Sequence, residues 1–428
     1  INSNKMYDNA FEWRFEFPEV LNDEGDFIGF DAVIGNPPYI FTRGEGFTES
    51  EKEYFYSNFK QQDYQLNTFT LFTENGYNLI KEKGFFGYIM PNNWLTISSD
   101  KKFRDFIISN SSDLIIINNI HKVFIGANVD TSILLLKKNS PDFVTLIESP
   151  FPNVYNIISQ QNYRTLLNKP VIHIRKQDDG LLIIDKISSH SSLLESIVSV
   201  STGLKAYQTG KGKPPQSNED KENRVYHSIK KINKNYGKYL QGVDVKRYSL
   251  AWSGEYLCYG DWLAEPRKSV PFKGPRILVR QIPSALPYMI NAVYTEDAYY
   301  NDINSMVIFS NEKESLKFIL GILNSRVISF WFNKEFDKMQ RNIFPQFKVN
   351  ELKKFPIPAL DLSKKDDIKK KDKLVALVDK MLGLKAETQP QLKAIRQIDD
   401  EIDRFVYSLY NLADEEINII VSFNEIKK

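Results

Sequence analysis

The chain has 428 residues, of which 26% are charged and 42% hydrophobic, and its formal net charge is +2. This composition, with 13% aromatic residues, predicts two or three folded domains and excludes a disordered chain. No apolar run approaches the roughly 20 residues that cross a bilayer, so a membrane protein is excluded as well. The single cysteine, Cys258, excludes a disulfide framework and favours a cytoplasmic location. The four histidines match no metal-ligand spacing, so no metal site is expected.

The first third of the chain alternates strand-like and helix-like segments. Short apolar runs predict strands over Phe30–Ile34, Phe85–Met90, Leu114–Ile117 and Val129–Lys137. Apolar residues at helical spacing predict helices over Glu49–Lys60, Thr68–Lys83 and Lys101–Asn110. Strand and helix alternating at this spacing indicate an α/β fold with a largely parallel sheet covered by helices.

The pattern changes after residue 150, where Gly and Pro separate short β-like runs such as Ile277–Arg280 and Met306–Phe309. This part is typical of an irregular α+β domain, with one amphipathic helix predicted over Glu314–Phe332. Apolar spacing in Leu374–Leu384 and Ile395–Tyr410 predicts a terminal helical pair. We therefore predict three parts, which are residues 1–150, 151–360 and 361–428.

The charge is distributed unevenly among these parts. Residues 1–140 carry a net charge of −6, and residues 151–360 carry +11. A basic segment between acidic ones suggests a module that meets a polyanion such as nucleic acid. A chance distribution of surface charge is the alternative interpretation.

The sharpest motif is Asn36-Pro37-Pro38-Tyr39, directly after the first predicted strand. Methyl transfer to a planar amino or amide nitrogen requires two acceptors that draw the nitrogen lone pair out of conjugation. The Asn36 side-chain oxygen and the Pro37 carbonyl can each accept one N–H, and the two prolines hold the carbonyls rigidly. Tyr39 offers a flat face for stacking. Positioning in a dry pocket then carries most of the catalysis.

Residues 26–140 resemble the second half of an N6-adenine DNA methyltransferase of the gamma class, in which a target-recognition domain follows the catalytic one. The resemblance rests on NPPY and on three further segments, which are Leu66–Gly84, Phe86–Leu95 and His121–Leu136. It implies a partial doubly wound, Rossmann-like methyltransferase sheet, followed by an α+β recognition domain and a helical tail. Phe11–Gly25 is similar to what precedes NPPY in restriction–modification fusion enzymes, so an upstream nuclease is a further expectation.

The resemblance also implies a site and a cofactor. The family flips the target adenine out of double-stranded DNA and holds it between two aromatic rings, here Tyr39 and Phe124. The methyl donor is S-adenosylmethionine, and Asn36, Pro38 and Phe69 would line only the edge of its pocket. The glycine-rich turn that holds most of the donor should precede Asn36, and residues 1–35 do not contain it. We therefore expect an N-terminal cut at Ile1 and a chain that is inactive alone.

The basic segment 151–360 resembles the family's target-recognition domain. Lys205, Lys211, Lys213, Arg276 and Arg280 are the expected phosphate contacts. Gln208 and Gln281 are weaker candidates for reading base edges.

Two alternatives stay open at this point. A protein glutamine methyltransferase shares NPPY, because an amide nitrogen poses the same lone-pair problem, but it has no need of a large basic domain. A DNA-binding specificity module without activity of its own is the other alternative. The sequence leaves the oligomeric state and the recognition site open.

Overall fold

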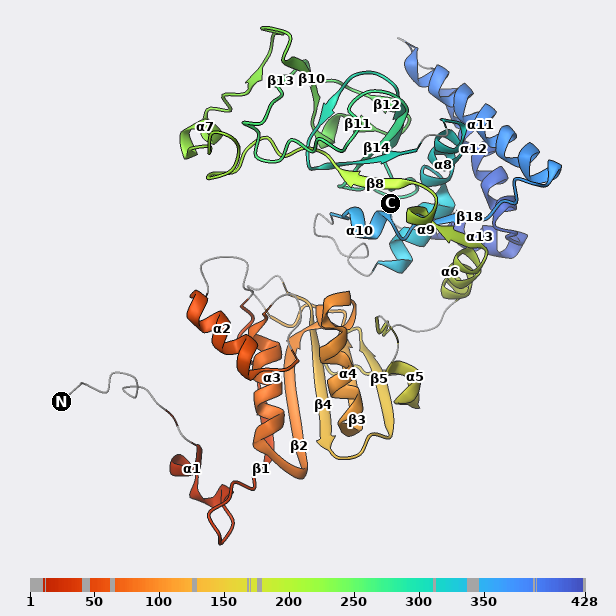
Figure 1. The fold of residues 1–428 in the computed structure, drawn as a ribbon. Coiled ribbons are helices and arrows are strands. Elements are labelled where there is room, and N and C mark those ends of the chain that lie inside the picture. The colour runs from red at the N-terminus through yellow and green to blue at the C-terminus, as the bar shows by residue number, and fades with distance from the viewer. Residues whose placement is uncertain are drawn as a thin grey trace. The chain divides into compact units, whose positions relative to one another are not determined.

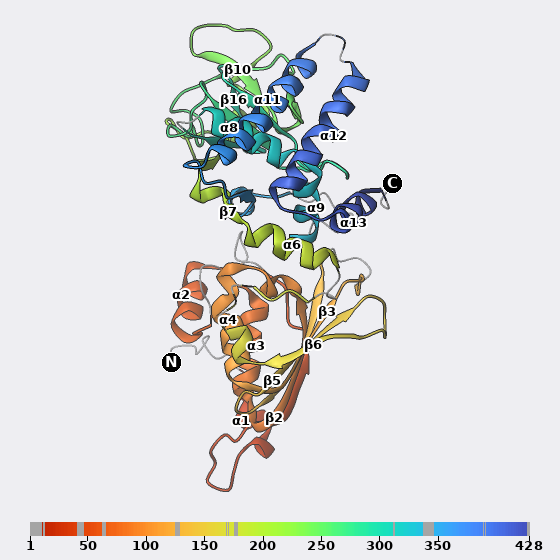
Figure 2. The same cartoon turned by 90° about the vertical axis from the view of Figure 1, so that its right-hand side faces the viewer.

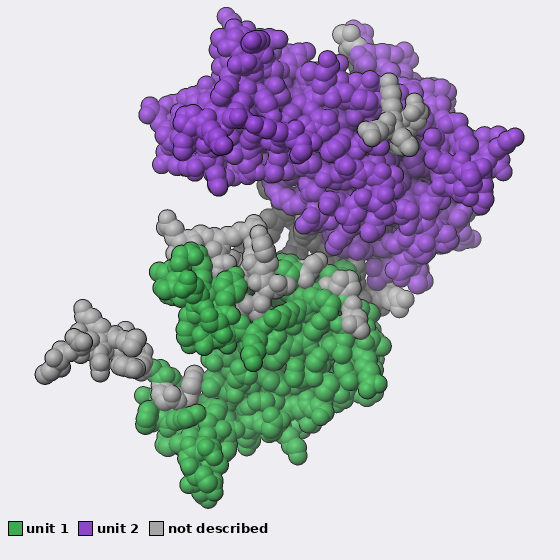
Figure 3. Space-filling view, viewed as in Figure 1, with its two compact units in different colours: residues 1–177 green, residues 178–428 purple. Residues whose placement is uncertain are grey.

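The computed structural model describes the chain except at the ends and in several internal segments. The residues it describes are 11, 13–40, 47–61, 66–124, 129–167, 169, 171–174, 179–310, 313–336, 346–387, 389 and 391–425. They form two compact units, unit 1 over residues 1–177 and unit 2 over 178–428 (Figure 3). The predicted three-part division stays a prediction, although the helices after residue 361 pack into the core of unit 2.

Unit 1 is an α/β unit built on one six-stranded sheet (Figure 1). Its strands are β1 (Phe30–Gly35), β2 (Ile80–Pro91), β3 (Ser111–Asn119), β4 (Thr131–Lys138), β5 (Phe143–Ser149) and β6 (Asn156–Asn162). Its α-helices are α1 (Trp13–Glu16), α2 (Glu49–Asn58), α3 (Thr68–Leu79), α4 (Lys101–Ser109) and α5 (Arg164–Leu167). The α/β class is confirmed.

The sheet of unit 1 has the order β1-β2-β4-β3-β5-β6 and is mixed. The pairs β1–β2 and β3–β5 are parallel, and the other neighbours are antiparallel. Strands β1, β2, β3 and β5 share one direction, in agreement with the expected largely parallel sheet, whereas β4 runs back between β2 and β3 and β6 is antiparallel to β5. The pairings make β1, β2, β3 and β5 end at one common edge, where ligands bind in open α/β sheets.

Helix α3 ends at Leu79, four residues earlier than predicted, because Ile80 already pairs with Phe30 in the sheet. The helix lies very close to β2, since a Cβ at Gly76 would meet the Phe86 ring at 2.8 Å. Helices α3 and α4 cover the same face of the sheet (Figures 1 and 2). The opposite face exposes apolar side chains, with Ile34 87% and Phe85 58% accessible.

Unit 2 contains two four-stranded sheets, with the orders β16-β10-β13-β9 and β15-β14-β17-β8, and two short ribbons. The strands are β7 (Ser191–Leu193), β8 (Ser199–Thr202), β9 (His227–Ser228), β10 (Tyr236–Leu240), β11 (Val245–Lys246), β12 (Ser249–Leu250), β13 (Tyr256–Cys258), β14 (Arg276–Arg280), β15 (Ala292–Thr295), β16 (Tyr300–Asn301), β17 (Ser305–Phe309) and β18 (Pro356–Pro358). The helices are α6 (Asp179–Ser189), α7 (Asn218–Glu222), α8 (Lys313–Leu323), α9 (Arg326–Glu335), α10 (Val349–Leu352), α11 (Lys365–Ala386), α12 (Leu392–Leu409) and α13 (Asp414–Glu425).

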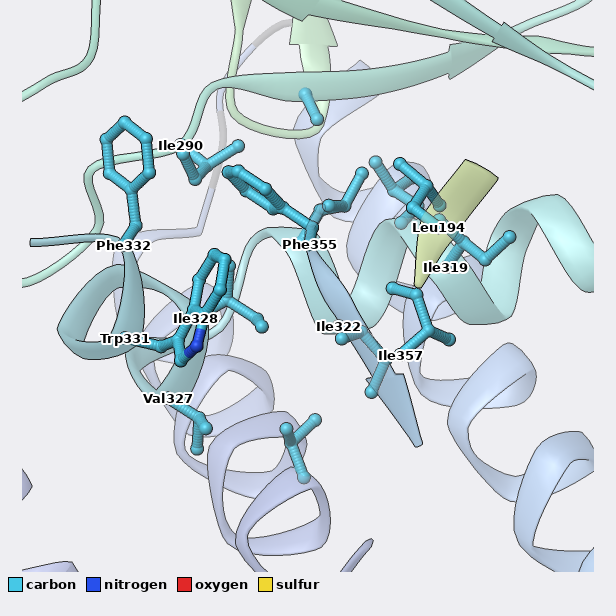
Figure 4. Close-up of a cluster of buried hydrophobic side chains, with 14 of the residues drawn as sticks. Leu194, Ile290, Ile319, Ile322, Val327, Ile328, Trp331, Phe332, Phe355 and Ile357 are labelled. Carbon is cyan, nitrogen blue, oxygen red and sulfur yellow. The ribbon is translucent and has the colours of Figure 1, made fainter. Parts of the chain in front are cut away.

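The single helix predicted over Glu314–Phe332 is two helices, α8 and α9. The break has a tertiary cause, because the Asn324 side chain pairs with both main-chain groups of Ala292 at 3.1 and 3.0 Å. Ser325 then caps α9, with its Oγ accepting the Ile328 N–H at 3.3 Å. A hydrophobic core of leucines, isoleucines and aromatic rings surrounds this corner (Figure 4).

The terminal helices belong to the same core. A Cβ at Gly321 would meet Val378 at 2.9 Å, so α11 approaches α8 as closely as glycine permits. Arg247 forms an ion pair with Asp399 of α12 at 2.6 Å, and Arg326 forms one with Asp403 at 3.1 Å. No helix among the described residues has the length and apolar character needed to cross a membrane.

His227 lies in β9, within an aromatic cluster beside the sheet β16-β10-β13-β9. Its Nδ1 is 2.8 Å from the Tyr207 hydroxyl, and its ring meets Tyr239 edge-on at 4.8 Å. The Nε2 atom is buried without a hydrogen-bond partner. Burial, assisted by the positive charge of Arg224, lowers the pKa of His227 to about 4. The imidazole is therefore neutral at neutral pH.

Candidate functional site

The NPPY turn lies at the common edge where the parallel strands of unit 1 end. It follows Gly35, the last residue of β1, which pairs with Tyr88 of β2. A Cβ at Gly35 would meet the Tyr88 ring at 3.1 Å, so the glycine lets the strand pass the aromatic side chain. Asn36 and Pro38 are exposed, Pro37 is buried and Tyr39 is half-buried.

Thr68, at the start of α3, ties the far side of this turn to the helix. Its Oγ1 donates to the Pro38 carbonyl at 2.5 Å and accepts the Ile40 N–H at 2.8 Å. The Thr68 N–H also donates to the Ile40 carbonyl at 3.1 Å. Sequence reasoning missed this residue, because its partners are 28 and 30 positions away.

The two acceptors that the chemistry requires are not engaged by any residue that the structure describes. Among the described residues, neither the Asn36 side-chain oxygen nor the Pro37 carbonyl has a hydrogen-bond partner. Thr68 meanwhile holds the neighbouring carbonyl of Pro38 in place. The turn is thus anchored at one side and presents free acceptors at the other.

Tyr39 is fixed by its hydroxyl, which donates to the Ile89 carbonyl at 3.0 Å. Its ring packs at the margin of the unit 1 core, and burial raises the pKa of Tyr39 to about 12. The side chain therefore stays neutral. The ring can offer an aromatic surface beside the acceptors.

Further polar side chains collect at the same edge of the sheet. Asn92 follows β2 and donates from Nδ2 to Asn118 Oδ1 at 2.8 Å. Asn119, the last residue of β3, donates to Thr131 Oγ1 at 3.0 Å. These residues extend the polar lining from the NPPY turn across neighbouring strands. The sequence signal for Asn92 was its position two residues after the strand predicted over Phe85–Met90.

The two phenylalanines of the expected site differ in their surroundings. Phe124 is half-buried in the connection between β3 and β4, beside residues 125–128, which lie outside the described residues. Phe69 is 1% exposed and meets Phe103 edge-on, with ring centroids 6.3 Å apart. Phe69 therefore packs in the core of unit 1, and its place at the edge of the cofactor pocket stays a prediction.

The expected phosphate contacts of unit 2 also separate into groups. Lys211 and Lys213 are exposed, whereas the Lys205 ammonium donates to Gln208 Oε1 at 2.6 Å. Arg276 is 0% exposed, and its guanidinium donates to the carbonyls of Gly274, Asp297 and Tyr299.

Burial lowers the pKa of Arg276 to about 10. The expectation that Arg276 contacts phosphate is therefore corrected, since a buried guanidinium cannot reach the DNA surface. Gln281 is likewise buried.

Sequence reasoning missed an exposed basic loop between β9 and β10. Lys230, Lys231 and Lys234 are exposed there and form no ion pair with described residues. Ile229 is 84% exposed in the same loop. The dense run of lysines in 229–235 could have revealed it. Over the described residues, no group of His, Cys, Asp or Glu is arranged to hold a metal ion.

Two family models match parts of this chain. Residues 1–124 match the Eco57I restriction-modification methylase family, and residues 237–357 match the TaqI-like C-terminal specificity domain. The first match contains the NPPY turn and Thr68. The second contains Arg280 and much of both sheets of unit 2.

Curated relatives agree with these matches. A putative type II restriction enzyme and methyltransferase of Methanocaldococcus jannaschii, RM.MjaORFECS2P, is 26% identical, and the alignment covers 97% of this chain and 34% of that protein. The type II restriction enzyme and methyltransferase RM.Eco57I of Escherichia coli is 32% identical over 28% of this chain and 12% of its own length. The type II methyltransferase M.HincII of Haemophilus influenzae is 24% identical over 83% of this chain and 79% of its own length.

The chain thus spans about a third of the Methanocaldococcus relative and a smaller share of the Escherichia one. Among solved structures, the type IIL restriction-modification enzyme MmeI in complex with DNA has a TM-score of 0.52 at 12% identity. The alignment covers 92% of this chain and 56% of that one. This likeness shows a shared fold.

Proposed function

Because the chain joins a restriction-modification methylase segment to a TaqI-like specificity domain, we propose that it transfers methyl groups to adenine N6 in double-stranded DNA. Unit 1 would hold the target base, and unit 2 would select the DNA sequence. The observation that carries the proposal is the anchored NPPY turn, whose Asn36 and Pro37 oxygens have no hydrogen-bond partner among the described residues.

These two oxygens suit an exocyclic amino group. Each would accept one N–H of the adenine amino group, which pulls its lone pair out of the ring and directs it outward. S-adenosylmethionine, when bound, supplies an electrophilic methyl on a sulfonium, so no strong base is needed. The tether to Thr68 keeps the acceptors in position before substrate arrives, which lowers the cost of orientation.

The aromatic partners follow from the same geometry. A base removed from the duplex loses its stacking, and aromatic side chains replace part of that energy. We assign Tyr39 as one face of the base pocket, because its hydroxyl bond to Ile89 fixes the ring. Phe124 is the proposed second face, and its half-buried position beside the polar edge is compatible with this role.

The described residues are better suited to bind the target adenine than to bind the methyl donor. At the common edge they supply amides, a hydroxyl and Tyr39, but no glycine-rich turn after a strand among the residues described. The outer edge of β1 pairs with no strand of the described chain, and the sheet face beside it exposes Ile34 and Phe85. We therefore assign most of the donor site to further polypeptide that pairs with β1 and covers this face.

DNA binding by unit 2 would depend on its exposed cations. Lys211 and Lys213, together with the loop lysines 230, 231 and 234, can neutralise phosphates and set affinity without reading sequence. Binding of the chain to duplex DNA should therefore weaken steeply as the salt concentration rises. A flat salt response would contradict this assignment.

The decisive experiment measures where radiolabelled methyl from S-adenosylmethionine is transferred. The enzyme in this assay is the polypeptide that includes the donor site. Label in N6-methyladenine of duplex DNA is expected. Label in cytosine or in protein would refute the proposal, and the latter would support the glutamine alternative. Asn36→Ala should slow transfer at least about a hundredfold, while the matched variant Asn156→Ala, which alters an exposed asparagine of β6, should leave the rate unchanged.

A second measurement tests the donor assignment alone. Calorimetric titration of S-adenosylmethionine into the 428-residue chain should show weak binding or none. Tight binding would show that the chain itself holds the donor, and the assignment of that site to other polypeptide would be wrong. Adenine transfer could still be correct in that case.

A further inference from the structure

A recess of about 290 Å³ opens in unit 2 where four segments meet. It is lined by residues 241–243 after β10, Arg280 and Ile282 at the end of β14, Asp302 and Asn304 before β17, and Gln346 ahead of α10. All of these residues lie within the part that matches the specificity domain. The recess is therefore a candidate for the surface that reads sequence.

Asp302 determines where the Asn304 side chain points. The carboxylate accepts the Asn304 main-chain N–H at 3.0 Å and its Nδ2 at 2.8 Å. Because a carboxylate only accepts, Nδ2 faces Asp302 and Oδ1 of the same amide points away. Oδ1 has no partner within the described chain. The recess thus holds one open acceptor in a fixed place.

Two other side chains offer open donors. The Arg280 guanidinium forms neither a hydrogen bond nor an ion pair with any described residue, although Asp302 lines the same recess. Gln346 Oε1 accepts a hydrogen bond from the Lys348 ammonium at 2.8 Å, and its Nε2 has no acceptor within the described chain. Donors and an acceptor are therefore presented together.

The buried side chain of Gln281 links the segments that line the recess. Its Nε2 donates to the Ile303 carbonyl at 2.6 Å, and its Oε1 accepts the Lys348 ammonium at 3.0 Å. Its main chain bonds to Asn304 and Phe347. One buried residue thus joins the segment before β17 to the segment before α10. The recess is formed before a ligand arrives, so little ordering is needed on binding.

We infer that this recess reads one G·C base pair from the major groove, with Arg280 donating to guanine and Asn304 accepting from cytosine. The inference rests on the proposed function, since it requires unit 2 to bind a specific duplex site. In the major groove, guanine shows two acceptors, N7 and O6, and cytosine shows the N4 amino donor. Open guanidinium donors beside a fixed amide acceptor match this pattern.

A phosphate fits the same side chains less well. Phosphate oxygens only accept and carry negative charge, whereas the recess also contains the acceptor of Asn304 and the carboxylate of Asp302. Arg280 is thus a base-reading residue, in contrast to its expected role as a phosphate contact. Gln281 is a positioning residue, because it acts through the segments it joins.

The test is a binding selection from randomised DNA duplexes, with the 428-residue chain and its Arg280→Ala and Asn304→Ala variants. Wild type should select a site that contains a G·C pair. Both variants should lose base preference at the same G·C position, where discrimination against other base pairs falls on the order of ten- to a hundredfold. The base preferences at the other positions of the site should not change. Melting temperatures confirm that the variants are folded, and Arg280→Lys should restore part of the preference.

Lys211→Ala is the matched control, because removing an exposed lysine that contacts phosphate should weaken binding to all sequences equally. The inference is overturned if Arg280→Ala also weakens binding uniformly, or if it leaves the selected site unchanged. It is equally overturned if the two variants relax different positions, or if the relaxed position is A·T. If wild type selects no sequence at all, the proposed recognition function of unit 2 fails first.

Discussion

The Thr68 hydroxyl is the contact whose removal tests the site most directly. Thr68→Val keeps the shape of the side chain but removes the bond to the Pro38 carbonyl at 2.5 Å and the bond from the Ile40 N–H at 2.8 Å. A hydrogen bond contributes about 1 kcal/mol net, so the turn loses about 2 kcal/mol of restraint. At 1.36 kcal/mol per factor of ten, the reactive conformation becomes about thirtyfold less populated.

We therefore expect the rate constant of methyl transfer to fall about ten- to thirtyfold. The lower figure applies because the Thr68 N–H and the Tyr39 hydroxyl still hold the turn. The assay is single-turnover transfer to duplex DNA in the polypeptide that includes the donor site, with DNA affinity measured in parallel. DNA affinity should not change, since unit 2 is unaltered.

Thr73→Val provides the matched control. Thr73 lies on the same helix and is fully buried, but its hydroxyl donates only to the Phe69 carbonyl of that helix, at 2.7 Å. It should lower stability without slowing transfer, and Thr68→Ser should recover most of the rate. A normal rate in Thr68→Val, or an equal loss in Thr73→Val, would refute the positioning role of Thr68.

Three further outcomes are expected. Asn36→Ala should slow methyl transfer at least about a hundredfold. It should leave the melting temperature unchanged, because the exposed side chain has no partner among the described residues. The transfer assay checks the rate, and thermal unfolding checks the stability. His227 has a pKa of about 4 in the folded state against 6.5 when unfolded, so the unfolded chain binds more protons between these values and stability falls as the pH drops. Urea unfolding should show a loss of about 2 kcal/mol from pH 7 to pH 5, and an equal loss in His227→Gln would assign the effect to another group. Arg276→Met should destabilise unit 2 by about 2–4 kcal/mol, because three carbonyls lose a charged donor. Lys211→Met should leave stability unchanged and reduce the salt slope of DNA binding by about one. The opposite pattern would contradict the assignment of Arg276 as the buried cation and Lys211 as the exposed one.

Local pattern was sufficient for several features. The strand before NPPY, the helix from Thr68 and the strand at Ile277–Arg280 follow from apolar spacing within a few residues. The chemistry of the turn also follows from residue type, because an amide oxygen and rigid proline carbonyls are the acceptors that an amino group needs. The α/β class and the resemblance to restriction–modification methyltransferases rest on the same segments.

Other features depend on residues that are distant in sequence. The helix predicted over Glu314–Phe332 breaks because Asn324 bonds to a strand 32 positions earlier. Arg276 was expected to contact phosphate because of its charge, but in the folded chain the carbonyls of Gly274, Asp297 and Tyr299 surround its guanidinium. The strand β4 returns between β2 and β3, which no local pattern showed.

The sequence by itself therefore determined which chemical groups are present and which short segments carry them. Only the tertiary structure decided which of those groups are free to act. Thr68 binds the Pro38 carbonyl, whereas that of Pro37 has no partner among the described residues, and Asp302 turns the Asn304 oxygen away from itself. Whether a polar atom is engaged depends on partners brought close by folding, and sequence spacing alone does not specify those partners.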